Sequence, residues 1–188
     1  MNPFVLHTLE TAPDEAKGPI GDVAKRFGFL PNVYAYIAEA PAALEALLQL
    51  SVLFGRTSLT EQQRHLLLLT SSVENECSFC VAAHTRGARA GGVGEESIAS
   101  IREGAIPERP EDAAMVSFVR AVIRTRGFVS DAEVQAFLDR GSTTRHVLEV
   151  VLGVTLKILT NYTNHLTHTE LNPELAAFEW TERRPRAE

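Results

Sequence analysis

Cysteine is scarce in this chain of 188 residues, with two in total, and no apolar run is long enough to cross a bilayer. The most apolar stretch, residues 147–159, is short and is interrupted by Glu149 and Lys157. The N-terminus lacks the basic start and apolar core of an export signal. The formal net charge is -6, and neither half offers the cationic surface that phosphate backbones require. We therefore expect a cytoplasmic protein with no membrane or nucleic-acid partner.

Alternating strand patterns bounded by hairpin turns are missing as well. Almost every segment instead has helical periodicity, and the composition, 45% hydrophobic and 22% charged, is ordinary for a soluble domain. We expect one all-α domain, a helical bundle over residues 1–188. Within it, residues 1–40 form an N-terminal arm, residues 41–126 form the core that carries the cysteines, and residues 127–188 form the C-terminal helices.

Prolines, capping residues and glycines delimit the expected helices. Ser130 and Glu133 form a capping box, and Gly91-Gly92 ends the helix that carries the cysteines. Residues 3–31 are expected to form an ordered arm. The expected helices cover residues 41–53, 60–75, 77–90, 95–103, 110–126, 131–140 and 143–166, and a short last one opens at Asn172-Pro173.

The two cysteines lie three residues apart, and a histidine follows the second by four. At about 100° per residue, Cys77, Cys80 and His84 fall within roughly a 60° arc of one helix face. The helix N-terminus beside Cys77 favours a thiolate, and His84 can accept or relay a proton. A peroxide can oxidise one such thiolate to a sulfenic acid, which the second cysteine converts to a disulfide.

Two other interpretations of this segment stay open. Both cysteines can be inert core residues. Alternatively they can bind zinc with His84 as a third ligand, although no second ligand pair follows at a suitable spacing. In a reducing compartment a lone cysteine pair is more often catalytic or metal-binding than structural. We favour redox chemistry without a metal.

At these residues the chain resembles a known superfamily. Residues 59–88, LTEQQRHLLLLTSSVENECSFCVAAHTRGA, are similar to the core of the alkylhydroperoxidase D-type and carboxymuconolactone decarboxylase superfamily, and residues 28–41 and 156–172 are similar to its peroxidase-related branch. The resemblance implies an all-α fold assembled as trimers or hexamers. It also implies that Cys77 and Cys80 are the redox pair and that His84 relays protons. The superfamily's decarboxylases work without this pair, so its presence favours the peroxidases.

The chain departs from the family pattern at His65, twelve residues before Cys77. These peroxidases usually have a glutamate there, which completes the proton relay. His65 can pass protons itself, or it can simply pack on an apolar helix. We expect Glu74, three residues before Cys77, to supply the carboxylate, so that Glu74→Gln slows the reaction more than His65→Ala. A ligand-lining role is open for Tyr162 and His165.

The sequence thus predicts a thiol–disulfide oxidoreductase that reduces hydroperoxides. Cys80 attacks and Cys77 resolves, or the reverse. We expect no haem, flavin or nucleotide cofactor, because no glycine-rich phosphate loop is present. An external dithiol or thioredoxin-like reductant must reduce the disulfide, since the chain has no further cysteine. The alternatives are a lactone decarboxylase or related lyase that uses histidines, and a non-enzymatic redox-sensing oligomeric module.

Overall fold

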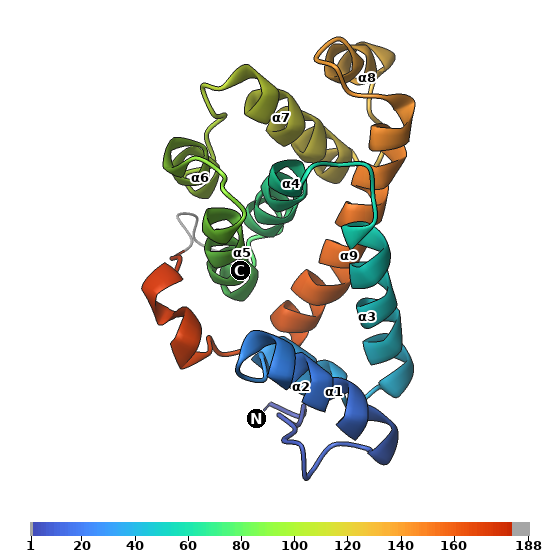
Figure 1. The fold of residues 1–188 in the computed structure, drawn as a ribbon, viewed down its shortest axis with the longest axis vertical. Coiled ribbons are helices and arrows are strands. Elements are labelled where there is room, and N and C mark those ends of the chain that lie inside the picture. The colour runs from blue at the N-terminus through green and yellow to red at the C-terminus, as the bar shows by residue number, and fades with distance from the viewer. Residues whose placement is uncertain (1, 182–188) are drawn as a thin grey trace.

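The computed structural model describes residues 2–181, and within that range the chain forms α-helices, one 3₁₀ helix and no strand (Figure 1). The all-α prediction is confirmed. In chain order the elements are α1 (Asp14–Phe27), α2 (Asn32–Ile37), α3 (Pro41–Gly55), α4 (Glu61–Glu74), α5 (Ser78–Ala90), α6 (Glu95–Arg102), α7 (Pro110–Arg124), α8 (Asp131–Leu138), α9 (Thr144–Thr167) and the 3₁₀ helix η1 (Pro173–Phe178).

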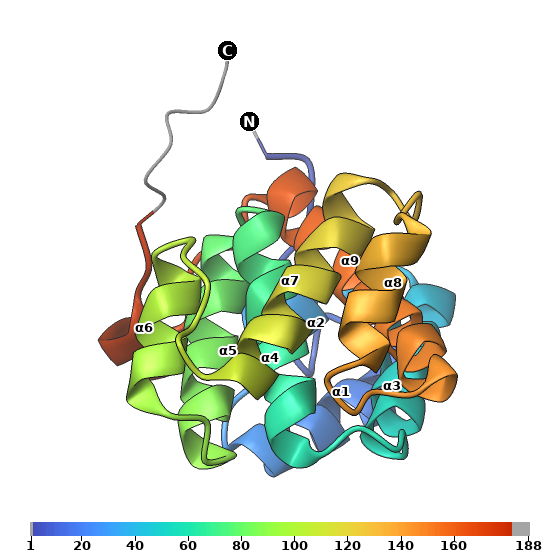
Figure 2. The same ribbon diagram turned by 90° about the horizontal axis from the view of Figure 1, so that it is seen from above.

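Helix α4 lies in the middle of the bundle, where it contacts α5, α6, α7 and α9 (Figures 1 and 2). Thr60 caps it, and the Thr60 hydroxyl and the Gln63 side chain form a reciprocal capping box with the backbone. Leu66, Leu67 and Leu69 are all buried, as expected for a helix that is apolar on several sides. The position of α4 makes it the support for both α5 and α9.

Helix α9 is the longest element and crosses the bundle beside α3, α4 and α5. Gly153 permits the close approach of three helices. A Cβ atom at this position would lie 2.7 Å from Phe54 Cε2 of α3 and 2.6 Å from Leu67 Cδ2 of α4. Since real Cβ atoms do not make such contacts, α9 requires glycine here to pack at this distance.

The helices predicted from residue 41 onward are present, with ends that shift by a few residues. The capping box of Ser130 and Glu133 is confirmed. The N-terminal arm contains more structure than predicted, namely α1 and α2. Pro19 lies inside α1, where proline normally disfavours a helix. Packing of Ala16 and Ile20 into the core offsets this local preference.

Within residues 2–181 no helix combines the length and the apolarity needed to cross a membrane.

Candidate redox site

The site is built at the start of α5. Cys77 is the N-cap residue, so its sulfur lies beside the free N–H groups of the first helical turn, and Cys80 follows within that turn. The backbone N–H of Cys77 donates to the carbonyl of Ser72 at 3.0 Å, and its carbonyl accepts from the N–H of Val81 at 2.9 Å. Both cysteines are free thiols, 2% and 3% exposed.

One amide of α9 joins the two sulfurs. Asn164 Nδ2 lies 3.5 Å from Cys77 Sγ and 3.2 Å from Cys80 Sγ. Asn161, one turn earlier on α9, is fully buried beside the pair. The structure therefore brings Cys77 and Cys80 together, as predicted from their spacing, and it adds amide donors from a helix about 80 residues further along the chain.

In the reduced protein the two cysteines have different ionisation states, with one proton between the two sulfurs. The pKa of Cys77 is lowered to about 3, chiefly by a hydrogen bond from the Cys80 thiol; burial opposes this, and His165, Lys157 and Asn161 contribute to the lowering. Burial raises the pKa of Cys80 well above its ordinary value, and the neighbouring Cys77 sulfur adds to this. Cys77 is accordingly the thiolate and Cys80 the thiol at neutral pH.

Cys77 is also the cysteine that lines a pocket of about 210 Å³, whereas Cys80 does not. Two lining residues have left-handed backbone conformations, Glu76 with φ 54° and His168 with φ 50°. Strained backbone of this kind concentrates at functional sites. The lining is completed by polar and aromatic side chains of α5, the end of α9 and the turn that follows it, namely Ser78, Phe79, Asn164, His165 and Thr169.

His84 contacts a lysine rather than a carboxylate. Lys157 Nζ of α9 lies 2.8 Å from His84 Nε2 and 3.1 Å from Thr160 Oγ1. Burial, the charge of Lys157 and that of His65 keep the pKa of His84 well below its ordinary value. The ring is therefore neutral, and its Nε2 accepts the hydrogen bond from the ammonium while Nδ1 carries the proton.

His65 packs against the glycine face of α5. A Cβ atom at Gly87 would lie 3.2 Å from His65 Cε1, and one at Gly91 would overlap the ring. His65 Nε2 is 3.9 Å from Glu61 of its own helix. Burial lowers the pKa of His65, and its charge acts in turn on His84. The structure thus places His65 close enough to influence the site electrostatically.

Glu74 is turned toward α7. Its carboxylate forms ion pairs with Arg120 at 2.8 Å and with Arg124 at 2.7 Å, and its side chain is 8% exposed. These contacts give Glu74 a structural role between α4 and α7. The relay role expected from the sequence stays a prediction.

The late residues of α9 divide into two groups. His165 lines the pocket, while Tyr162 is 52% exposed and its ring stacks with that of His165, with 6.3 Å between the centroids. The sequence analysis did not predict Lys157, Asn161 or Thr160 as residues of the site. They share a buried stripe with Asn164, since their spacings of three, four and seven residues keep them on one face of an apolar helix.

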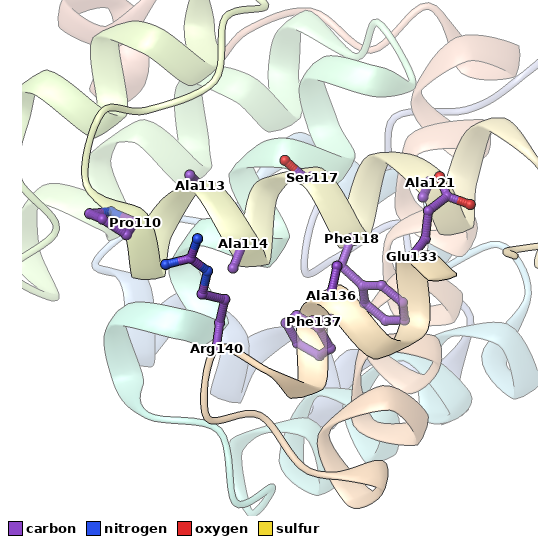
Figure 3. A pocket seen from close by; sticks show the side chains of 10 residues that line it. All are labelled: Pro110, Ala113, Ala114, Ser117, Phe118, Ala121, Glu133, Ala136, Phe137 and Arg140. Atoms are coloured by element: carbon purple, nitrogen blue, oxygen red, sulfur yellow. The ribbon is translucent and has the colours of Figure 1, made fainter. Parts of the chain in front are cut away.

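A second pocket, of about 300 Å³, lies between α7 and α8 (Figure 3). Phe118 and Phe137 stack in it with centroids 4.3 Å apart, and Arg140 stands at its edge in Figure 3. Its lining contains no cysteine or histidine. Within residues 2–181 no group of three His, Cys, Asp or Glu side chains is arranged to hold a metal ion. The reactive groups therefore gather at the α5–α9 contact.

Comparisons with known proteins agree with this picture. The model of the carboxymuconolactone decarboxylase family matches residues 38–118. The alkylhydroperoxidase core of a peroxidase-related protein from Ralstonia eutropha JMP134 has a similar structure, with 24% sequence identity, a TM-score of 0.80 and coverage of 92% of this chain and 93% of that one. A peroxidase-related protein from Silicibacter sp. TM1040 gives 18% identity, a TM-score of 0.78 and coverages of 93% and 95%.

A third structure is that of the C82A variant of the debrominase Bmp8 in complex with 2,3,4-tribromopyrrole. It shares 12% identity with this chain, with a TM-score of 0.74 and coverages of 88% and 89%. A search of curated proteins found no match. These findings agree with the resemblance stated from the sequence: the carboxymuconolactone decarboxylase family model matches residues 38–118, and the chain has the same fold as the two peroxidase-related proteins.

Proposed function

We propose that this protein reduces hydroperoxides with Cys77 as the attacking thiolate and Cys80 as the resolving thiol. The observation that carries the proposal is the placement of the pair. Cys77 lines the pocket and Cys80 does not. The side-chain amide of Asn164 donates to the sulfurs of both cysteines, which holds them close together. Of the two orders left open by the sequence, this geometry supports attack by Cys77.

The chemistry balances with the groups present. The Cys77 thiolate attacks one oxygen of the hydroperoxide, the O–O bond breaks, and the products are a Cys77 sulfenic acid and an alkoxide that takes up a proton. The Cys80 sulfur then attacks the Cys77 sulfur, its proton leaves with the hydroxyl group as water, and a disulfide forms. An external dithiol or a thioredoxin-like protein returns two electrons and two protons, because the chain contains no other cysteine.

The test is a thiol count before and after treatment with a hydroperoxide. We expect the loss of two thiols per chain, a Cys77–Cys80 disulfide by mass spectrometry, and recovery with dithiothreitol. Cys77→Ser should abolish consumption of the peroxide. Cys80→Ser should still consume one equivalent and stop at an oxidised Cys77 without a disulfide. Retention of both thiols during peroxide turnover would contradict the proposal.

The same assay separates the other functions. Loss of two thiols without sustained turnover by a dithiol would favour a redox-sensing module. Lactone turnover by a Cys77→Ser, Cys80→Ser protein would favour the lyase. Because a debrominase shares the fold, 2,3,4-tribromopyrrole is included as a second electrophile. Release of bromide that is faster than peroxide reduction would reassign the substrate class.

We also propose that the protein works as a homotrimer or homohexamer. Helix α9 is 24 residues long and leaves an apolar stripe in solvent along one side, with spacings of three, four and seven residues. Stripes of this kind pack against other helices. Its members are Leu148, Val151, Ile158, Tyr162 and Leu166.

A further inference from the structure

The chain contains three lysines, and one of them is in an unusual place. Lys17 and Lys25 pair with aspartates one turn away, with side chains 41% and 82% exposed. Lys157 is 2% exposed. Burying an ammonium group costs several kcal/mol unless an opposite charge compensates it. Lys157 therefore needs an anion nearby.

The direct partners of Lys157 do not supply that anion. They are His84 Nε2 at 2.8 Å and the Thr160 hydroxyl at 3.1 Å, and both groups are neutral. No ion pair within residues 2–181 includes Lys157. Of the acids around the site in the sequence, Glu74 pairs with two arginines, Glu61 lies beside His65, and Glu76 is exposed to solvent in the pocket lining.

The remaining candidate is the redox pair itself. The charge of Lys157 lowers the pKa of both cysteines, so the ammonium acts on the two sulfurs directly. The Tyr34 phenol on α2 supplies no anion either, because burial raises its pKa above the ordinary value. Near α7, Arg120 is bound to Glu74. Further titratable groups around the cluster are His65 of α4, His84 of α5 and His165 of α9, together with Glu76 and His168, which line the pocket beside Cys77.

We propose that Lys157 is the proton carrier of the redox cycle: its ammonium balances the Cys77 thiolate in the reduced protein and gives up its proton through His84 as the disulfide forms. The proposal rests on the redox function proposed above. Lys157 acts through His84, so it is a positioning residue.

The proton balance follows from the charges. The reduced site holds Cys77 as thiolate, Cys80 as thiol and Lys157 as ammonium. When the O–O bond breaks, the alkoxide takes up a proton from the solvent of the pocket. Lys157 gives one proton to His84 Nε2, and His84 releases its Nδ1 proton to solvent in return. The second proton leaves with water when Cys80 attacks. In the disulfide form the anion is gone, and burial then favours the neutral amine. Reduction by two electrons therefore takes up two protons.

The test is the equilibrium of the disulfide with a glutathione redox buffer between pH 6 and pH 7.5, where the glutathione thiols are protonated. If reduction takes up two protons, the equilibrium constant does not change with pH. If Lys157 keeps its charge in both states, reduction takes up one proton and the constant rises tenfold per pH unit. The wild-type protein should give the first result, and the second would overturn the proposal.

Two variants sharpen the test. Lys157→Arg keeps the positive charge but cannot release a proton, so its equilibrium constant should rise tenfold per pH unit. A constant independent of pH in this variant would also overturn the proposal. Lys157→Met should raise the midpoint at which the thiolate absorbance of the reduced protein near 240 nm is lost on acidification. Lys25→Met is the matched control and should match the wild type in both measurements.

These measurements need only a disulfide that forms and is reduced, and no peroxide turnover. A protein that forms no Cys77–Cys80 disulfide with oxidised glutathione or peroxide would contradict the proposed function. A protein that forms the disulfide but takes up one proton on reduction would contradict only the role of Lys157.

Discussion

The ionisation of Cys77 leads to a quantitative prediction about the reduced protein. Its pKa is lowered to about 3, chiefly by the hydrogen bond from Cys80. The thiolate should therefore be about 99% populated at pH 5, whereas an ordinary cysteine with a pKa of about 8.5 would be ionised to about 0.03%. Absorbance near 240 nm, titrated from pH 8 downward, should stay flat to pH 5 and correspond to one thiolate per chain. Cys77→Ser should remove this absorbance, and Cys80→Ala should shift its midpoint upward.

The same ionisation fixes how stability depends on pH. The folded pKa of Cys77 is lower than the unfolded value, so the unfolded chain binds one more proton between these two pKa values. The resulting stabilisation is fully present above about pH 8.5, falls by about 1.4 kcal/mol per pH unit on acidification, and vanishes near the folded pKa. Between pH 7 and pH 5 the reduced protein should lose about 3 kcal/mol relative to Cys77→Ser.

Urea unfolding of both proteins in a reducing buffer measures this difference. The other titrating groups, His84 included, are present in both proteins, so their contributions to the free energy of unfolding cancel in the comparison. A gap that does not change with pH, together with an absorbance that disappears below pH 8, would show that Cys77 is an ordinary thiol. The Cys80 hydrogen bond and the charge of Lys157 would then not stabilise a Cys77 thiolate.

Three further predictions concern packing and assembly. Gly153→Ala should lower the free energy of unfolding by about 1–3 kcal/mol in urea, because its Cβ overlaps side chains of α3 and α4; an unchanged midpoint would contradict the close helix contact. Glu74→Gln should lower it by about 2–4 kcal/mol, since two arginines lose their carboxylate. If the relay predicted for Glu74 exists, the folded variant should also lose about tenfold or more in peroxidase rate at pH 7 while His65→Ala loses less, and a full rate would contradict that role. Light scattering should show a trimer or hexamer at micromolar concentration, and a double variant, Tyr162→Lys with Leu166→Lys, should shift the mass toward monomer; a monomeric wild type would end this proposal.

Much of the secondary structure and the reactive face could be predicted from the sequence, because local patterns specify them. The Ser130–Glu133 capping box, the proline at the first position of α3 and the glycines that end α5 act within a few residues. The placement of Cys77, Cys80 and His84 on one helix face follows from helix geometry alone. Helix α1 escaped prediction because its stabilisation comes from burial of Ala16 and Ile20, which outweighs the local effect of Pro19.

Only the tertiary structure decided which cysteine lines the pocket and which side chains of α9 lie beside the cysteine pair. The contact between α5 and α9 joins His84 to Lys157 and both cysteines to Asn164, pairs that lie 73 to 87 residues apart in the chain. In the sequence, Lys157 only interrupts an apolar helix, and Glu74 is close to Cys77. In the fold, Lys157 lies against the redox site and Glu74 pairs with α7. Helix packing brings distant side chains together and turns neighbours in the sequence toward different partners, and no local pattern records either effect.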